Sequence, residues 1–313
     1  MGSTPRPFRF GASVWRADSR AEWVDRARRL EDLGFSTLLL PDHLLDVLSP
    51  FAPLVAAAQA TRRLRIGTFV LNNDLRHPLL VAREAAAVDL LSDGRLELGL
   101  GAGHARSEYL RAGLPFDPFA VRAARLAESV AIIGRLLVGE RLSFSGEHYQ
   151  LDQQEIYPRP LQAPRPPLLV GGNSRAVLTL AAEQAEIVGF TGFGQTRSER
   201  VVLSGFTGAA TSQRIAWVRE AAGERFDRLE LNALLQAVAV TEHRESVAAA
   251  QAERLPGLTP DEILESPYLL IGTVDEMVET LRQRRQRFGI SYYVVFEAAI
   301  EAFAPVVARL AGS

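Results

Sequence analysis

Two patterns of apolar and polar positions follow one another along this chain from end to end. Short segments that are mainly apolar or alternate between apolar and polar residues, typical of buried strands, occur at 8–14, 37–40, 64–71, 95–100, 168–170, 186–190, 231–240 and 291–296. Apolar residues at helical spacing occur at 19–33, 51–61, 78–91, 119–138, 175–185, 213–222 and 303–310, with two or three further helices before residue 288. Eight strands, each followed by a helix, predict an α/β fold of the (β/α)₈ TIM-barrel type, with insertions at the strand carboxyl ends and a single domain spanning residues 1–313.

Three segments depart from this repeat. Residues 142–151 contain Phe-Ser-Gly-Glu-His and predict a hairpin, and the proline-rich segment 158–167 must be extended. The Gly-, Ser- and Thr-rich segment 191–212 predicts a mobile loop. An open doubly wound sheet is the alternative fold. Because residues 15–18 after the first strand read Trp-Arg-Ala-Asp, without a glycine-rich phosphate loop, the barrel is favoured.

Composition narrows the possible functions. A net charge of −2 gives no sign of a nucleic-acid-binding surface, and the absence of cysteine excludes thiolate chemistry and Cys-ligated metals. The five histidines are too widely spaced for a helix-borne metal site, so no metal is expected. No apolar run is long enough to cross a bilayer, and the N-terminal residues lack the apolar stretch of a signal peptide. We therefore expect a soluble, cytoplasmic protein without a membrane partner.

The most informative segment is the strand at 95–100 and the residues after it. Three alternating glycines, Gly99, Gly101 and Gly103, lead into His104, and Arg, Ser and Glu follow at 106–108. Glycine removes each Cβ that would keep a planar ligand away from the backbone. The alternative is a glycine-rich strand exit that packs closely against a helix.

Polar residues also follow three other strands, and in a barrel all four strand ends share one rim. Asp42 and His43 follow the second strand, Asn72 the third, and Gly-Gly-Asn-Ser at 171–174 the fifth. An imidazole exchanges protons near neutral pH, an amide can bind the edge of a heterocycle, and a helix N-terminus binds phosphate. Ordinary helix capping by Asp42, by Asn173 or by Ser174 is the alternative at two of these ends. The pattern favours a flat, phosphate-bearing cofactor with histidines beside it.

At this point the chain resembles the luciferase-like monooxygenase superfamily, whose members are bacterial-luciferase-type barrels. The resemblance covers essentially the whole chain and is carried by Leu-Leu-Leu-Pro-Asp-His-Leu at 38–44, Asp-Gly-Arg-Leu-Glu-Leu-Gly-Leu-Gly-Ala-Gly at 93–103 and Pro-Leu-Leu-Val-Gly-Gly at 167–172. Within the superfamily it is most similar to the branch that uses the 5-deazaflavin coenzyme F420. That resemblance implies an F420-dependent oxidoreductase, which moves a hydride between the deazaflavin and a small organic substrate, and a homodimer formed through helices 51–61 and 78–91.

The resemblance also assigns cofactor contacts near the ring. Asp42 and His43 match a pair beside the pyrimidine edge and the reactive carbon. Phe69 and Val70 match a non-proline cis peptide that forms a bulge behind the ring, and Asn72 falls where a threonine often contacts it.

Two further loops complete the implied site. Gly103, His104 and Ser107 fall on the loop after the fourth strand, along the ring and ribityl chain. The phosphate-side loop is formed by Val170, Gly171, Gly172 and Asn173.

Three positions depart from the family pattern. Ala102 stands where flavin-dependent members commonly have an arginine for the FMN phosphate, which argues against FMN. His104 replaces a glutamate acid of the sugar-phosphate dehydrogenases in the F420 branch, and Leu44 replaces their tryptophan, which argues against that substrate.

These observations lead to one main hypothesis and two alternatives. In the main hypothesis His43 is the proton donor or polarising group and His104 assists or orients the substrate. If neither histidine acts as the acid, Glu108, Tyr109 or a water would take that role. The alternatives are an FMN-dependent monooxygenase and a catalytically silent cofactor-binding barrel.

Overall fold

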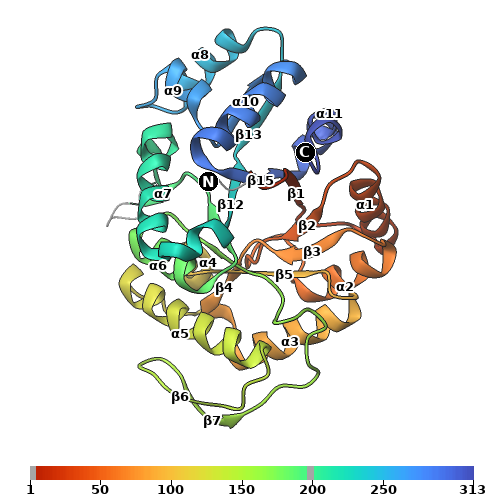
Figure 1. The fold of residues 1–313 in the computed structure, drawn as a ribbon, viewed down its shortest axis with the longest axis vertical. Coiled ribbons are helices and arrows are strands. Elements are labelled where there is room, and N and C mark those ends of the chain that lie inside the picture. The colour runs from red at the N-terminus through yellow and green to blue at the C-terminus, as the bar shows by residue number, and fades with distance from the viewer. Residues whose placement is uncertain (1–4, 196–200) are drawn as a thin grey trace.

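Eight parallel strands close into a barrel in the computed structural model, which describes residues 5–195 and 201–313 (Figure 1). Around the barrel they follow the order β1 (Arg9–Ser13), β2 (Thr37–Leu40), β3 (Arg65–Thr68), β5 (Leu96–Gly101), β8 (Leu168–Gly171), β9 (Ile187–Phe190), β12 (Glu230–Leu235) and β15 (Ile290–Phe296). β15 pairs with β1, and β3 pairs with β5, which closes the ring. The predicted (β/α)₈ barrel is confirmed.

One long helix covers the barrel after each strand. These helices are α1 (Arg20–Asp32), α2 (Phe51–Ala60), α3 (Pro78–Leu91), α5 (Phe119–Leu137), α6 (Arg175–Gln184), α7 (Gly208–Ala222), α10 (Val274–Phe288) and α11 (Ile300–Leu310). Their ends follow local sequence signals. The Ser19 side chain caps α1, and Thr273 and Glu276 form a capping box at the start of α10. The main apolar core lies between this helical layer and the sheet.

Shorter elements interrupt the repeat. β4 (Leu71–Asn72) and η1 (Asn73–Leu75) follow β3, and α4 (Arg106–Arg111) follows β5. The hairpin of β6 (Leu142–Ser145) and β7 (Gln150–Gln154) follows α5. α7 is preceded by β10 (Gly194–Gln195), β11 (Val201–Val202) and η2 (Leu203–Phe206), and it is followed by η3 (Gly223–Arg228). Four elements precede α10: β13 (Ala237–Val240), α8 (Arg244–Arg254), α9 (Pro260–Glu265) and β14 (Leu269–Gly272). One short helix, η4 (Glu297–Ala299), precedes α11. The group around α8 and α9 lies at one end of the molecule, and the β6–β7 hairpin at the other (Figure 1).

Two expectations from the sequence need correction. The predicted strand 231–240 divides into β12, which stays in the barrel, and β13, which pairs with β14, a strand that the sequence analysis missed. The helix expected at 213–222 begins earlier, at Gly208, because the hydroxyl of Thr207 caps it by accepting the Ala210 N–H. Residues 196–200 of the expected loop 191–212 lie outside the described residues.

The hairpin predicted at 142–151 is confirmed, since β6 and β7 pair as antiparallel strands. It follows α5 and precedes β8, so it starts from the amino side of the barrel. The carboxylate of Glu128 on α5 accepts the backbone N–H groups of residues 147, 148 and 149, which holds the hairpin against that helix.

Paired charges fill the amino end of the barrel interior. The Glu97 carboxylate accepts hydrogen bonds from Arg9 and Arg65, both at 2.6 Å, and from the Tyr292 hydroxyl at 3.3 Å. Arg9 also forms a two-pronged pair with Glu230, at 2.9 and 2.7 Å. Burial alone would raise the pKa of Glu97, but the charges of the two arginines outweigh burial and lower it.

We expect Glu97→Gln to lower the free energy of unfolding at pH 7 by about 3–5 kcal/mol, because it leaves buried arginine charge uncompensated. Since the folded protein lowers the pKa of Glu97, its contribution is present above the ordinary value of 4.5 and is lost as the pH falls below it. Urea unfolding at pH 7 and at acidic pH checks both statements. An equal loss of stability in the variant at every pH would contradict the electrostatic explanation.

Candidate functional site at the barrel mouth

The carboxyl ends of the eight strands meet at one mouth, and the predicted site residues follow four of them. Two of these residues are brought into direct contact: the rings of His43 and His104 have centroids 5.3 Å apart and planes at 89°. They come from the loops after β2 and β5, which are separated in the barrel by β3. The structure therefore places two imidazoles, edge to face, at the mouth.

Glu108 on α4 fixes the position of the His43 ring. Its Oε1 lies 2.8 Å from His43 Nδ1, and its Oε2 accepts the Leu44 N–H at 2.7 Å. The Glu108 side chain is 6% exposed, whereas that of His43 is 29% exposed. The carboxylate is thus enclosed beneath an imidazole that remains accessible. Sequence analysis named Glu108 only as a substitute acid; its buried position on a six-residue helix was not visible in the chain.

His104 differs from His43 in its electrostatic surroundings. Although part of its surface is accessible, the surrounding protein desolvates the ring, and this and the neighbouring His43 lower the pKa of His104 below its ordinary value of 6.5. At neutral pH the His104 imidazole is therefore uncharged. In that form it can donate or accept a hydrogen bond without presenting a positive charge to a ligand.

The chain between β3 and β4 forms the bulge expected from the family resemblance. The Phe69–Val70 peptide bond is cis, as predicted. Phe69 and Val70 are partly buried and pack against the interior cluster of the barrel. A Cβ at Gly101 would lie 2.6 Å from a Val70 methyl, and a Cβ at Gly99 would lie 2.1 Å from the carbonyl oxygen of Thr68. These two glycines therefore make room for the bulge, and the ligand approach suggested by the sequence stays a prediction.

Asp42 and Asn72 connect the ends of β2 and β4. Asp42 Oδ2 accepts the Asn72 N–H at 3.0 Å and forms an ion pair with Arg76. Asn72 Oδ1 accepts the Asp74 N–H at 3.2 Å and the Tyr109 hydroxyl at 2.8 Å. The acceptor of the Asn72 amide is thus used within the protein, and its NH₂ group is what it can offer to a ligand.

Arg122 supports the loop after β5 from behind, and sequence analysis did not identify it. It is buried on α5 and donates to the carbonyl oxygens of Ala102, at 3.0 Å, and Gly103. Its guanidinium lies 4.1 Å from the centroid of the Phe116 ring. Gly103 has a φ of 71°, and a Cβ there would lie 2.1 Å from the Tyr109 hydroxyl. An arginine on the otherwise apolar face of the helix 119–138 was the sequence signal that could have identified Arg122.

The phosphate-side loop is held by its own contacts. The Gly172 N–H donates to the carbonyl of Gly189 at 3.0 Å. Asn173 Nδ2 donates to the Thr191 hydroxyl and the Phe193 carbonyl, both at 2.6 Å. Ser174 caps α6, as one alternative from the sequence proposed. An anion at this end of the site would therefore be bound by the first backbone N–H groups of α6 rather than by Gly172 or the Asn173 amide.

Three other predicted residues contribute in different ways. The Val170 side chain is buried in the core between sheet and helices, so only its backbone lies at the mouth. The Ala102 side chain is also buried, and Ser107 lies exposed on the first turn of α4. Sequence analysis missed the aromatic pair of Trp15 and Phe296, whose centroids are 5.7 Å apart at the ends of β1 and β15.

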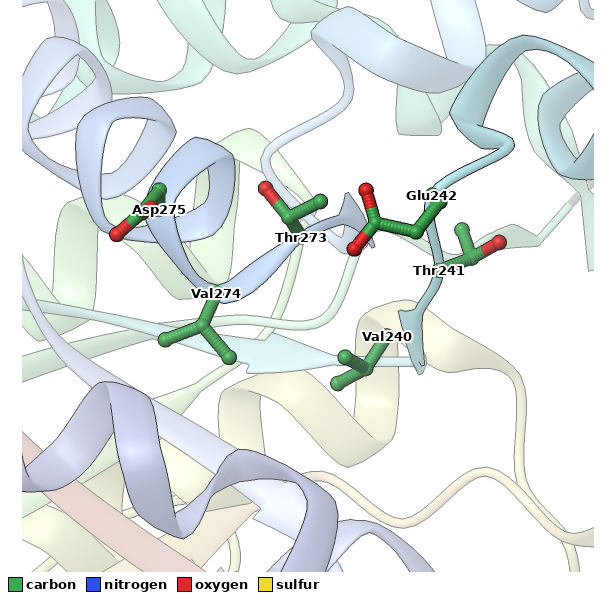
Figure 2. Close-up of a pocket in the computed structure, with 6 residues that line it drawn as sticks. All are labelled: Val240, Thr241, Glu242, Thr273, Val274 and Asp275. Carbon is green, nitrogen blue, oxygen red and sulfur yellow. The ribbon is translucent and has the colours of Figure 1, made fainter.

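A separate cavity of about 430 Å³ lies away from these residues (Figure 2). It is lined by residues that follow β13 and begin α10: Val240, Thr241, Glu242, Thr273, Val274 and Asp275. Thr273 is occupied in capping α10, and Asp275 is paired with Arg309. The mouth, where two imidazoles and a buried carboxylate meet, is the stronger candidate for chemistry.

Comparison with known families agrees with this architecture. Residues 6–292 match the family described as luciferase-like monooxygenase. The chain belongs to the luciferase-like monooxygenase family. The fold is similar to that of an F420-dependent secondary alcohol dehydrogenase in complex with an F420–acetone adduct, which is 19% identical, with a TM-score of 0.77 over 97% of this chain and 99% of that one.

Two curated relatives show how this luciferase-like protein compares in sequence. The F420-dependent glucose-6-phosphate dehydrogenase of Nakamurella multipartita is 35% identical over 58% of this chain and 56% of the relative. The 4-hydroxyprotoasukamycin monooxygenase of Streptomyces nodosus subsp. asukaensis is 35% identical over 51% of this chain and 42% of the relative. The matched region thus spans about half the length of each relative. The proteins that this luciferase-like chain resembles thus include F420-dependent enzymes in both comparisons.

In the described residues, no helix is both long enough and apolar enough to cross a membrane.

Proposed function

We propose that this protein is an F420-dependent oxidoreductase that moves a hydride between the deazaflavin and a small organic substrate. The observation that carries the proposal is the contact of His43 and His104 at the mouth, beside the Phe69–Val70 bulge. F420-dependent relatives in both the sequence and the structure comparisons support the choice of cofactor.

The residues at the mouth fit a flat, phosphate-bearing cofactor. Phe69 and Val70 offer an apolar surface for a ring. The NH₂ group of Asn72 can donate to a heterocycle edge, and the first turn of α6 can bind a phosphate. His104 can line the same space as a neutral group. When bound there, F420 would supply two-electron hydride transfer, which its carbon-for-nitrogen replacement favours over reaction with oxygen.

The side chains of this protein would manage the accompanying proton. Hydride addition to a polarised double bond leaves negative charge that must be protonated. His43 can deliver a proton from Nε2, because Nδ1 faces Glu108. His104 can hold a substrate oxygen by a hydrogen bond without adding charge.

An FMN-dependent monooxygenase is the second candidate, and the matched monooxygenase relative favours it. Against it, Ala102 lacks the side chain that would contact an FMN phosphate, and Arg122 donates to backbone carbonyls there. A silent cofactor-binding barrel remains the third candidate.

Fluorescence titration distinguishes the three candidates. We expect F420 to bind, and FMN to bind much more weakly, because Ala102 offers FMN phosphate no charge. Micromolar binding of FMN with no binding of F420 would contradict the proposal. Tight F420 binding without hydride transfer across a broad panel of alcohols, imines, enones and enoates would favour the silent barrel.

The role of His43 can be tested by His43→Gln. We expect kcat to fall by about 10²–10⁴-fold, the usual contribution of general-acid help, while the Kd for F420 changes less than about tenfold. Stopped-flow measurement of F420 absorbance with saturating substrate gives kcat. His243→Gln serves as the matched control, since His243 is exposed at the start of α8. Weaker F420 binding with unchanged kcat would show that His43 only lines the ring.

We also propose that the protein is a homodimer formed through α2 and α3. Leu80, Leu90 and Leu91 on α3 are exposed by 44–52%, and Leu161, exposed by 57%, is attached beside them through its N–H bond to Asp89. Exposed apolar residues gathered in this way are typical of a protein interface.

Light scattering tests the dimer. We expect a mass about twice the 34.3 kDa of one chain, and a mass near one chain after Leu80→Lys and Leu91→Lys are combined, because two lysines on each face would repel and desolvate poorly. A wild-type mass of one chain would contradict the proposal.

A further inference from the structure

The contact between the buried Glu108 carboxylate and the accessible His43 ring decides which ring nitrogen faces the mouth. We propose that Glu108 is a positioning residue that holds His43 with Nδ1–H toward the carboxylate and Nε2 toward the reacting groups. The importance of this contact for turnover rests on the proposed function; the positioning itself does not, because it is a property of the protein alone. The contact is 2.8 Å long.

The two hydrogen bonds of Glu108 leave little choice of ring state. An ionised carboxylate only accepts hydrogen bonds, so the His43 nitrogen that faces it must carry the proton. The Leu44 N–H occupies the other oxygen at 2.7 Å, which prevents the carboxylate from turning away. In a neutral imidazole the second nitrogen is then an acceptor, and in the charged ring it is an acid. Either way, Nε2 is the nitrogen that exchanges protons at the mouth.

The helix that carries Glu108 is itself held on its other side. The next residue, Tyr109, is buried, and its hydroxyl donates to Asn72 Oδ1 at 2.8 Å and lies 3.1 Å from Asp74 Oδ2. α4 is therefore attached to the end of β2 through Glu108 and to the β4–η1 segment through Tyr109. A six-residue helix has little stability of its own, so these two attachments define where the carboxylate lies.

His43 and the neighbouring His104 have different surroundings and therefore different roles in this proposal. His104 lies at right angles to His43, and two adjacent rings do not readily carry positive charge together. Only His43 has the carboxylate contact. The lowered pKa of His104 is consistent with a neutral partner beside a proton-carrying His43.

Glutamine is the informative substitution because it keeps the shape of Glu108 but has a single acceptor. If the amide oxygen faces His43 Nδ1–H, the NH₂ group meets the Leu44 N–H, and two donors oppose each other. If the NH₂ group faces His43, Nδ1 must become an acceptor and the proton moves to Nε2. Glu108→Gln is therefore expected to shift His43 toward the opposite tautomer.

The experiment is ¹⁵N NMR of the histidine-labelled protein at a pH where His43 is neutral, without cofactor or substrate, with assignments from single His→Gln variants. We expect wild-type His43 to show the Nδ1–H pattern and the Glu108→Gln protein to lose it. With F420 and substrate, we expect kcat to fall by about 10–100-fold, the usual effect of removing a hydrogen-bond partner behind a functional histidine, with little change in KM for F420. Glu128→Gln is the matched control, since Glu128 also accepts backbone N–H groups but belongs to the hairpin contact.

Glu108→Asp keeps two acceptor oxygens on a shorter stem, and it covers the case in which the glutamine variant fails to fold. It should retain the Nδ1–H pattern while kcat falls less than in the glutamine variant. An unchanged His43 tautomer in Glu108→Gln, or a kcat loss equal to that of Glu128→Gln, would overturn the proposal. If wild-type protein does not bind F420, the proposed function fails while the tautomer pattern still decides the positioning role.

Discussion

The mouth of this barrel depends on steric exclusion at Gly99 and Gly101. A Cβ at Gly99 would overlap with the carbonyl oxygen of Thr68 at the end of β3, and a Cβ at Gly101 with Val70 in the segment between β3 and β4. Because the two glycines leave space for that segment, Val70 packs against the interior cluster. β4 then follows in a position where Asn72 forms hydrogen bonds with Asp42 and Tyr109. The attachment of α4, and with it the carboxylate behind His43, follows from this packing. The absence of side chains at two positions of β5 thus allows the contacts that connect the end of β2, the β4 segment and α4.

The two ends of the barrel contain different polar groups. At the amino end, Glu97 is enclosed by Arg9 and Arg65, so its charge is permanently neutralised and serves stability. At the carboxyl end, the rings of His43 and His104 lie in contact, and Nδ1 of His43 lies 2.8 Å from the Glu108 carboxylate. The stabilising ion pairs and the proposed reaction site are therefore separated along the barrel axis, as is usual for this fold.

Much of this arrangement could be predicted from the chain, because buried parallel strands and helices leave strong periodic signals. The strand 37–40 and the helix 78–91 have the predicted bounds, and the resemblance anticipated the cis bond at Phe69–Val70. β14 was missed because its short apolar run pairs with β13 outside the barrel repeat. Local pattern gives no information on such long-range pairing.

The site was predictable as a set of polar strand ends, but its internal contacts were not. The meeting of His43 with Glu108 joins residues that are 65 positions apart and depends on how α4 packs. The buried Arg122 likewise donates to carbonyl oxygens that lie 20 and 19 positions before it in the chain. Gly99 and Gly101 also make room for Thr68 and Val70, a steric requirement that only the three-dimensional structure reveals.

A crystal structure of the protein soaked with F420 tests the central claim most directly. We expect the ring in contact with Val70 and within hydrogen-bonding distance of the His43 and His104 imidazoles, with the phosphate at the first turn of α6. Ring density elsewhere, such as in the cavity beside Thr241 and Thr273, would contradict the claim that the barrel mouth is the cofactor site.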